Sequence, residues 1–216
     1  MSIPVLRFYG RHHGKKISTS RQGLMKTFLP QVLFSAGDCL PVDRPVYLEI
    51  GFGGGEHLLA MAQQHPEAFF IGAEPFVNGV ASLVDLLAHN PQVNNVRIYP
   101  DDVRKLFEFF PAQSFDGVFL LYPDPWPKVR HEKRRFLVPN QQQALARILK
   151  PKGWVQVATD AEAYALWAQE VMEQTGLWQQ TLTDIHCPPK DWVTTRYEQK
   201  GLKAGRVPTY LLYVKK

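Results

Sequence analysis

From residue 46 onward, short apolar runs alternate with longer segments whose apolar residues recur at helical spacing. The runs predict strands at Val46–Ile50, Phe69–Ala73, Asn95–Tyr99, Phe115–Tyr122 and Trp154–Thr159. The segments between and after them predict helices over 55–65, 76–89, 102–110, 132–149 and 161–175. Near-continuous apolar strands separated by helices indicate an α/β fold, in which a mostly parallel sheet has helices on both faces. Two later runs, Trp178–Ile185 and Thr209–Val214, predict antiparallel strands at one edge of the sheet.

The length of the chain allows one such domain with a full core, because 216 residues are marginal for two. We predict a single domain over 38–216, a basic N-terminal arm over 1–37, and a long loop over 186–207. No apolar run approaches the ~20 residues of a membrane span, and the N-terminus has no apolar signal core. Cys39 and Cys187 stand alone, without metal-ligand spacing. We therefore expect a cytoplasmic protein that uses no metal and has no membrane partner.

The basic residues are concentrated in three segments, 1–37, 128–135 and 190–216. Together these segments hold 18 of the 25 Lys and Arg residues but 3 of the 20 Asp and Glu residues, a net charge of +15. The rest of the chain has a net charge of −10. An acidic body with basic segments is typical of a protein that binds a polyanion, although many charge runs are only solvated surface. The pattern therefore favours a nucleic acid as partner.

In a parallel sheet, ligands bind at the carboxyl ends of the strands. The first predicted strand ends there in a glycine-rich turn, where Glu49, Gly51, Gly53 and Gly55 form the pattern E-x-G-x-G-x-G. Glycines let the backbone pass close to a ligand. The turn is neither a phosphate loop nor G-x-G-x-x-G, because Glu56 occupies the third glycine position. A carboxylate beside such a turn suits a cationic ligand, a sulfonium or an ammonium, better than a pyrophosphate.

Acidic residues follow the next two predicted strands. Glu74 lies about 20 residues beyond the glycines, where an acid is placed to bind the two hydroxyls of a ribose. Asp101 and Asp102 follow the third strand. One of them could accept a hydrogen bond from an adenine amino group, but Asp102 could equally cap the helix that follows. The sequence leaves these two roles open.

The fourth predicted strand leads into the segment Tyr122-Pro123-Asp124-Pro125-Trp126-Pro127-Lys128, followed by a basic run up to Arg135. The prolines fix the backbone around Asp124 and Trp126. An acid beside an indole ring can read and stack a nucleobase, and the basic run can reach phosphates. The alternative is a proline-rich loop before a cationic helix start. It explains the placement poorly, because cations at a helix N-terminus oppose the helix dipole.

A further acid, Asp160, follows the fifth predicted strand, where it could serve the site or cap the next helix. Near the C-terminus, the segment Thr195-Arg196-Tyr197-Glu198 is by itself a weak signal.

Taken together, these segments resemble the bacterial tRNA (guanine-N7-)-methyltransferase family over nearly the whole chain. The family pattern P-D-P-W-x-K-x-R-H-x-K-R-R stands at Pro123 to Arg135, L-E-I-G-F-G begins at Leu48, and T-[KR]-[FY]-E stands at Thr195 to Glu198. The family's basic N-terminal motif R-R-x-G-R is only loosely matched, by residues 10–16. The resemblance implies a Rossmann-like S-adenosylmethionine-dependent methyltransferase fold. It further implies methyl transfer from S-adenosyl-L-methionine to N7 of a guanine in the tRNA variable loop.

The resemblance also implies roles for individual residues. Around the methyl donor it places the glycine turn of Gly51, Gly53 and Gly55 and the acids Glu49, Glu74, Asp102 and Asp124. Asp124 is the implied catalytic residue. Contacts to the guanine and its surroundings are implied for Lys128, Asp160, Thr195, Arg196, Tyr197 and Glu198. The implied partner is tRNA, and the protein is expected to be a monomer or a homodimer.

Guanine N7 carries a free lone pair at neutral pH, so the nucleophile needs no general base. Asp124 could favour the positive charge that the methylated purine gains, or it could orient the base through guanine N1–H and the amino group. Two alternatives remain. One is a methyltransferase of the same fold that acts on another RNA or on a small molecule, and the other is a non-catalytic RNA-binding protein. The charge pattern argues against a small molecule, and the complete set of acids expected around the donor argues against a loss of catalysis.

Overall fold

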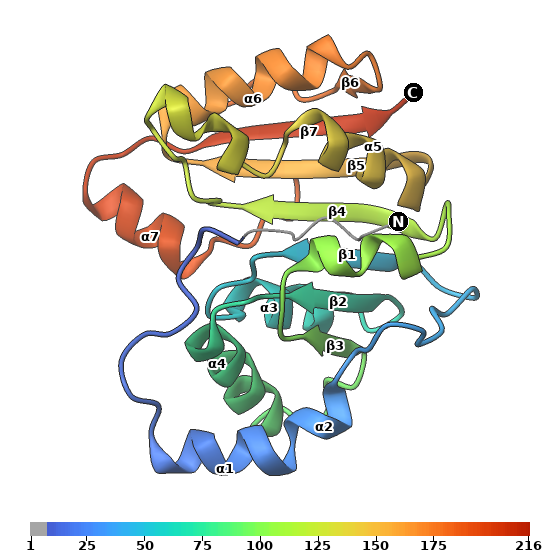
Figure 1. Cartoon of the computed structure of the whole chain (residues 1–216), viewed down its shortest axis with the longest axis vertical. Coiled ribbons are helices and arrows are strands. Elements are labelled where there is room, and N and C mark those ends of the chain that lie inside the picture. Colours follow the sequence, from blue (N-terminus) through green and yellow to red (C-terminus); the bar gives the residue numbers. More distant parts are fainter. Residues whose placement is uncertain (1–7) are drawn as a thin grey trace.

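The structure is a computed structural model that describes residues 8–216. Its centre is a seven-stranded sheet in the order β3-β2-β1-β4-β5-β7-β6 (Figure 1). The strands are β1 (Val46–Ile50), β2 (Phe69–Ala73), β3 (Val96–Tyr99), β4 (Phe115–Leu121), β5 (Leu149–Thr159), β6 (Trp178–Gln180) and β7 (Thr209–Lys215). Strands β1 to β5 are parallel, whereas β7 pairs antiparallel with both β5 and β6. The predicted parallel sheet with an antiparallel edge is confirmed.

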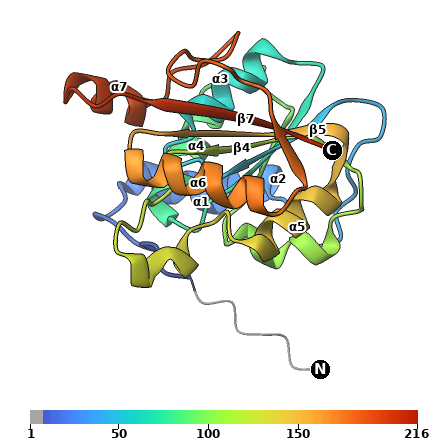
Figure 2. The ribbon, with the colours of Figure 1, turned by 90° about the horizontal axis from the view of Figure 1, so that it is seen from above.

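Helices cover both faces of the sheet (Figure 2). They are α1 (Thr19–Thr27), α2 (Leu29–Val32), α3 (Glu56–Gln64), α4 (Val77–Ala88), α5 (Pro139–Ile148), α6 (Glu162–Gln174) and α7 (Arg196–Lys203), with three 3-10 helices, η1 (Val103–Lys105), η2 (Phe107–Phe109) and η3 (Val129–Arg134). Residues of α3 and α4 form one apolar core with the sheet, and residues of η1, η2, α5 and α6 form a second. Because both faces are buried, the parallel strands are apolar along nearly their whole length.

Two predicted helices differ from the structure. The segment 102–110 forms the short helices η1 and η2 rather than one α-helix. Val103, Leu106, Phe107 and Phe110 face the core while Phe109 is exposed, so the spacing predicted most of the buried side but not the helix type. The predicted helix 132–149 divides into η3 and α5. The cause is Pro139, which has no amide hydrogen and can only begin a helix, and which leaves Val138 before it extended.

Two strand ends differ from the prediction by five residues, and the other ends agree to within one residue. Strand β5 begins at Leu149, five residues before the predicted start at Trp154, and it pairs there with Phe115 of β4 across an irregular register. Strand β6 ends at Gln180, well before the predicted end at Ile185. Both differences concern the ends of strands, where side-chain patterns are weakest.

The described part of the N-terminal arm, residues 8–37, lies against the rest of the protein. Arg21 on α1 donates to Asp85 on α4 through Nε at 3.2 Å and Nη2 at 3.1 Å. The amide of Phe34 donates to the carbonyl of Ile98 in β3 at 2.8 Å. The predicted boundary between arm and domain stays a prediction, and the first seven residues of the arm lie outside the described part.

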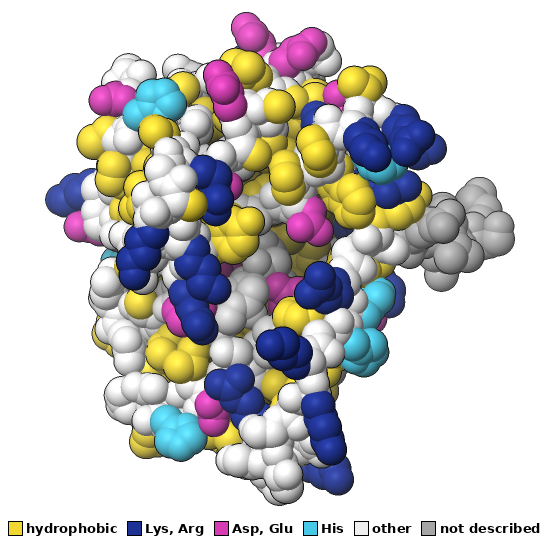
Figure 3. All heavy atoms as spheres, turned by 90° about the vertical axis from the view of Figure 1, so that its left-hand side faces the viewer, with side chains coloured by type: hydrophobic (Ala, Val, Ile, Leu, Met, Phe, Trp, Pro, Cys, Tyr) yellow, Lys and Arg dark blue, Asp and Glu magenta, His cyan; other side chains and the backbone are white. Residues whose placement is uncertain are grey.

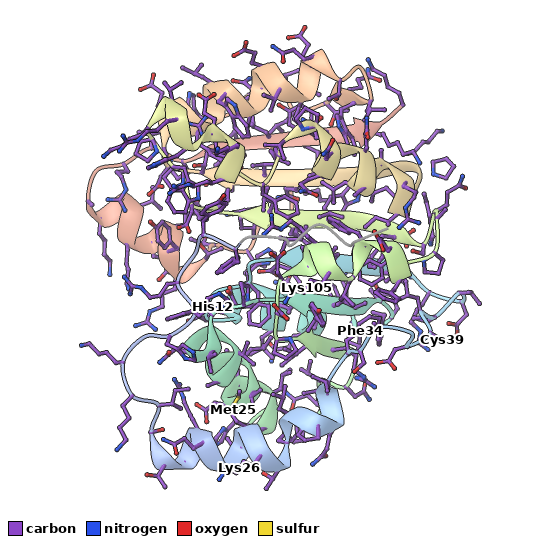
Figure 4. The ribbon with its side chains drawn as sticks, viewed as in Figure 1. His12, Met25, Lys26, Phe34, Cys39 and Lys105 are labelled. Carbon is purple, nitrogen blue, oxygen red and sulfur yellow. The ribbon has the colours of Figure 1, made fainter. Side chains whose placement is uncertain are left out.

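The carboxyl ends of β1 to β5 meet at one edge of the sheet, on the left in Figure 1. In Figure 4, His12 lies at this edge, whereas Phe34 and Cys39 lie toward the opposite one. Among the described residues, no helix is long and apolar enough to cross a membrane.

Candidate active site

A cavity of about 340 Å³ opens at the carboxyl ends of β1 and β4. Its walls are formed by Glu49, Gly51, Phe52, Gly53, Gly54, Glu56, His57, Ser82, Leu121, Tyr122, Thr195, Arg196, Tyr197 and Lys200. The cavity thus joins the turn after β1 to the start of α7, two segments far apart in the sequence. Its volume falls within the range of about 300–1,000 Å³ that small-molecule sites occupy.

The glycine turn between β1 and α3 has a backbone that other residues rarely adopt. Gly51, Gly53 and Gly55 have φ values of 73°, 56° and 82°. A side chain at Gly55 would also approach Leu83 of α4 to 2.7 Å. Gly79 of α4, for which no role was predicted, faces the same turn, and a Cβ there would lie 2.3 Å from the carbonyl oxygen of Gly53. Helix α4 can therefore approach the turn closely only because residue 79 has no side chain.

Glu49 lies next to the last residue of β1, and its carboxylate is buried at the bottom of the cavity. Its Oε2 lies 2.8 Å from Nδ1 of His57 on α3, and each of the two side chains is 3% exposed. Both residues line the cavity. The sequence prediction included Glu49 but missed His57. The signal that could have found it is a histidine two residues after the last glycine of the turn, at the start of a helix.

Glu74 follows β2 and braces the same turn. Its Oε2 accepts from the amide of Gly53 at 2.8 Å, and its Oε1 accepts from the amide of Phe76 at 2.9 Å. Each carboxylate oxygen keeps a second lone pair for a further donor. Burial raises the pKa of the Glu74 carboxyl, the two amides oppose this shift, and the charges of Asp124 and Glu49 raise the pKa further. Asp124 is therefore near enough to Glu74 for the two charges to interact.

Asp102 takes the capping role that the sequence left open. Its carboxylate begins η1 by accepting from the amide of Arg104 at 3.0 Å, and it also pairs with the Arg104 guanidinium. Asp102 is buried and is not among the residues that line the cavity. Its predicted contact with the donor stays a prediction.

The loop after β4 presents Asp124 with an exposed side chain between two prolines. Tyr122 and Trp126, two residues before and after it, have φ values of 49° and 40°. Such a conformation costs about 1–3 kcal/mol at a residue other than glycine and persists only where neighbouring contacts hold it. The loop is therefore kept in shape by the groups packed behind it.

Arg135 is one of these groups. Its Nε donates to the carbonyl of Pro125 at 3.0 Å, and its Nη2 donates to the carbonyl of Trp126 at 3.2 Å. Its guanidinium lies 4.7 Å from the ring centroid of Trp167, and its side chain is 4% exposed. The prediction that the basic run reaches phosphates is wrong for Arg135, because the side chain is turned inward to bind the loop.

The other cations of the run differ in their surroundings. Arg134 lies between two rings, with its Cζ 4.6 Å from the centroid of Tyr9 and 4.9 Å from that of Trp126. This contact ties the N-terminal arm to the Asp124 loop. Lys128, Arg130 and Lys133 are exposed. Lys128 is not among the residues that line the cavity, so its predicted contact with the substrate stays a prediction.

We expect Arg135→Met to lower the free energy of unfolding by about 2–4 kcal/mol, because the carbonyls of Pro125 and Trp126 lose the donor that holds the loop while the aliphatic part of the buried side chain is kept. Urea unfolding followed by tryptophan fluorescence measures this. The matched control is Arg130→Met, which removes an exposed arginine from the same run. Equal losses in the two variants would show that Arg135 does not hold the loop.

Helix α7 forms the opposite wall of the cavity and lies within the predicted loop 186–207. Thr195 begins the helix, because its Oγ1 accepts from the amide of Glu198 at 3.0 Å. Thr-x-x-Glu is the sequence pattern of a capping box, so the sequence held a signal for this helix. Tyr197 is 56% exposed, and its ring lies 5.4 Å from that of Tyr122. Arg196 is exposed, with its Nη1 3.8 Å from Glu56.

Glu198 is buried behind this wall. Its carboxylate accepts from Nε1 of Trp192 at 2.9 Å and from the hydroxyl of Tyr210 at 2.6 Å. Glu198 also raises the pKa of Tyr122, second to the effect of burial. In this structure Glu198 anchors α7 to the body of the protein, and its predicted contact with the substrate stays a prediction.

Asp160 follows β5 and is held by Arg206, whose Nε lies 2.6 Å from Asp160 Oδ2. The alternative that Asp160 caps the next helix is wrong, because the N-cap residue of α6 is Ala161 and no side chain caps this helix. Asp160 Oδ2 also lies beside Gly201, where a Cβ would approach it to 2.9 Å. Asp160 thus packs against α7, on the same side of the site as Tyr197.

The surface around the cavity carries both basic and acidic side chains. Figure 3 shows Lys and Arg side chains on both sides of a hollow, with acidic side chains between them. Such an arrangement can hold a cation inside and a polyanion across the rim. Within residues 8–216, no group of three or more His, Cys, Asp and Glu side chains could hold a metal ion.

Solved structures support the class of protein that this fold and site define. The chain is similar to the 16S rRNA methyltransferase KamB, with a TM-score of 0.58 and 12% identity over 94% of this chain and 95% of that one. It is also similar to a precorrin-6y C5,15-methyltransferase from Geobacter metallireducens, with a TM-score of 0.53 and 15% identity over 94% of each chain. At these identities the likeness shows the fold alone. The fold is thus one that these methyltransferases share.

Proteins with similar sequences identify the family to which the chain belongs. A protein-family model described as "Putative methyltransferase" matches residues 43–211. The chain is 41% identical to a tRNA (guanine-N(7)-)-methyltransferase of Paracoccus denitrificans, covering 97% of this chain and 95% of the relative. A protein of the same name from Bartonella quintana is also 41% identical, with the same coverage. The chain belongs to the tRNA (guanine-N7-)-methyltransferase family.

Proposed function

We propose that the protein transfers a methyl group from S-adenosyl-L-methionine to N7 of a guanine in the variable loop of tRNA. The observation that carries this proposal is one cavity with two different walls. One wall is the glycine turn with the buried carboxylate of Glu49, and the other is α7 with the exposed ring of Tyr197. Exposed cations on both sides of the hollow suit the tRNA backbone, and the names of the relatives supply the chemistry.

The residues of the first wall fit S-adenosyl-L-methionine. The carboxylate of Glu49 suits the cationic part of this ligand, and the free lone pairs of Glu74 suit the two hydroxyls of its ribose. The glycine turn lets the backbone approach the ligand without side chains between them. When bound, the ligand supplies an electrophilic methyl group on a sulfonium.

The residues of the second wall would position the acceptor. The exposed ring of Tyr197 offers a surface on which guanine can stack. Asp124 lies on the loop after β4 and is not among the residues that line the cavity. It would orient the base, or would favour the positive charge that the purine gains as N7 bonds to the methyl carbon. Because N7 already has a free lone pair, the main task is to hold it in line with the methyl group, at about 3–3.5 Å. We further propose that this takes place in the cytoplasm, while the number of subunits stays a prediction.

Methyl transfer to defined tRNA tests the proposal. The protein is incubated with methyl-labelled S-adenosyl-L-methionine and an unmodified tRNA transcript, and the product is cleaved with aniline after reduction, which breaks the chain at 7-methylguanosine. We expect a single cleavage in the variable loop. The control is the same transcript with that guanosine replaced by adenosine. Cleavage elsewhere would contradict the variable-loop assignment, and a protein that binds the donor but labels no tRNA would contradict the function.

We expect Glu74→Ala to weaken the binding of S-adenosyl-L-methionine by about 1–3 kcal/mol, because charge-assisted hydrogen bonds to the ribose are lost. Isothermal titration calorimetry without tRNA measures this. The control is Glu67→Ala, which removes an exposed glutamate near the opposite end of β2. An unchanged dissociation constant in a folded Glu74→Ala protein would remove Glu74 from the donor site.

A further inference from the structure

Glu49 and His57 contact each other in the wall of the cavity. Both side chains are buried, both line the donor cavity, and Glu49 Oε2 lies 2.8 Å from His57 Nδ1. A buried carboxylate without a partner is costly, and a hydrogen bond fixes the direction in which its second oxygen faces. None of the predicted roles at this site uses His57.

The His57 ring is itself held in place by aromatic neighbours. Its centroid lies 4.9 Å from that of Phe119 on β4, in an edge-to-face arrangement. On another side it lies 5.9 Å from the ring of Trp192. Nε1 of Trp192 in turn donates to Glu198 of α7 at 2.9 Å. The imidazole therefore stands between the carboxylate on the donor side and the segment that carries the acceptor wall.

We propose that His57 is a positioning residue for the methyl donor, which holds the Glu49 carboxylate in the orientation that receives the cationic part of S-adenosyl-L-methionine. The ring contacts with Phe119 and Trp192 hold the imidazole in place. The imidazole in turn holds the orientation of the Glu49 carboxylate. This proposal rests on the proposed function only in the identity of the donor, because it concerns donor binding and not transfer to tRNA.

Two substitutions separate positioning from packing. Asn places an amide nitrogen near the position of Nδ1 and can still donate to Glu49, whereas Leu fills a similar volume without a donor. We expect H57L to raise the dissociation constant of S-adenosyl-L-methionine about 10- to 100-fold, and H57N to stay within about threefold of the wild type. Calorimetric titration of the full-length protein with the donor alone measures both. A histidine that only fills the core predicts the opposite order, with Leu tolerated and Asn harmful, and this order would overturn the proposal.

A double-mutant cycle shows whether His57 acts through Glu49. We expect E49Q to weaken donor binding. We expect H57L to weaken binding little further when it is added to E49Q, because the carboxylate that His57 orients is already absent. Independent, multiplying losses would overturn the proposal. Both outcomes are read from donor binding, so they remain informative whether or not the protein methylates tRNA.

If H57L does not fold, the proposal can be tested by NMR on the protein with His57 in place. In protein labelled with ¹⁵N-histidine, saturation with S-adenosylhomocysteine is expected to shift the Nδ1 resonance of His57, identified by its loss in H57N. The E49Q protein should lose this response. An Nδ1 resonance that does not move on saturation would overturn the proposal.

Discussion

Asp124→Asn is expected to lower the rate of methyl transfer by about 10²-fold or more, as when one preorganised electrostatic contact is lost. The substitution keeps the shape of the side chain and removes its charge. The loop should keep its conformation, because Arg135 binds the carbonyls of Pro125 and Trp126 and does not touch the Asp124 side chain. Overall tRNA affinity should survive, since phosphate contacts dominate it. Single-turnover rates at saturating donor and tRNA measure the effect.

The control for this prediction is Asp43→Asn, which removes an acid that is 71% exposed, shortly before the amino end of β1. Its rate should equal that of the wild type. Asn forms helix caps and turns about as well as Asp, so a purely structural role for Asp124 predicts near-normal transfer. A rate within about threefold of wild type, a difference under ~0.7 kcal/mol, would end the catalytic assignment.

The affinity for tRNA is expected to fall steeply with ionic strength. Exposed cations lie on the arm, on the segment after β4 and on α7, at Arg11, Lys15, Lys16, Lys128, Arg130, Lys133, Lys200 and Lys203. If five of them each neutralise a phosphate, the affinity should fall roughly 10²- to 10³-fold over a fourfold rise in salt, at a slope of about 0.7 to 0.9 per phosphate. Filter binding across a salt series measures this.

Donor affinity in the same salt series is the first control, and we expect it to change little because the donor site is small and largely buried. Lys133→Gln should reduce the tRNA salt slope by about 1. Lys152→Gln, an exposed lysine near the amino end of β5, should leave the slope unchanged. Similar salt slopes for tRNA and donor would show that the basic segments do not hold the polyanion.

Much of this fold could be predicted because its signals are local. Val46–Ile50 and Phe69–Ala73 are strands from the first to the last predicted residue, since a buried parallel strand is an unbroken apolar run between polar turns. The division of the predicted helix 132–149 at Pro139 was missed, although a proline inside a helical pattern is a signal for it. The type of the helices in 102–110 could not be predicted, because the same apolar spacing fits an α-helix and a pair of 3-10 turns.

The site was harder to predict, because its contacts join distant parts of the chain. The placement of the glycine turn, Glu49 and Glu74 at the carboxyl ends of β1 and β2 followed from the sequence, and their roles stay predictions. The partner that orients Glu49 was not predicted, since His57 looks like an ordinary residue at the start of a helix. Charge alone also misassigned Arg135, because nothing in a basic run tells which of its side chains turns inward.

The order of the strands separates the two halves of this site along the chain. The half that we propose for the methyl donor comes from the turns after β1 and β2, in the parallel part of the sheet. Helix α7, which forms most of the proposed acceptor wall, belongs to the connection between β6 and β7, at the antiparallel edge. Insertions or deletions in that connection leave the register of β1, β2 and β4 untouched. An enzyme of this design can thus change its acceptor during evolution while it keeps the same methyl donor.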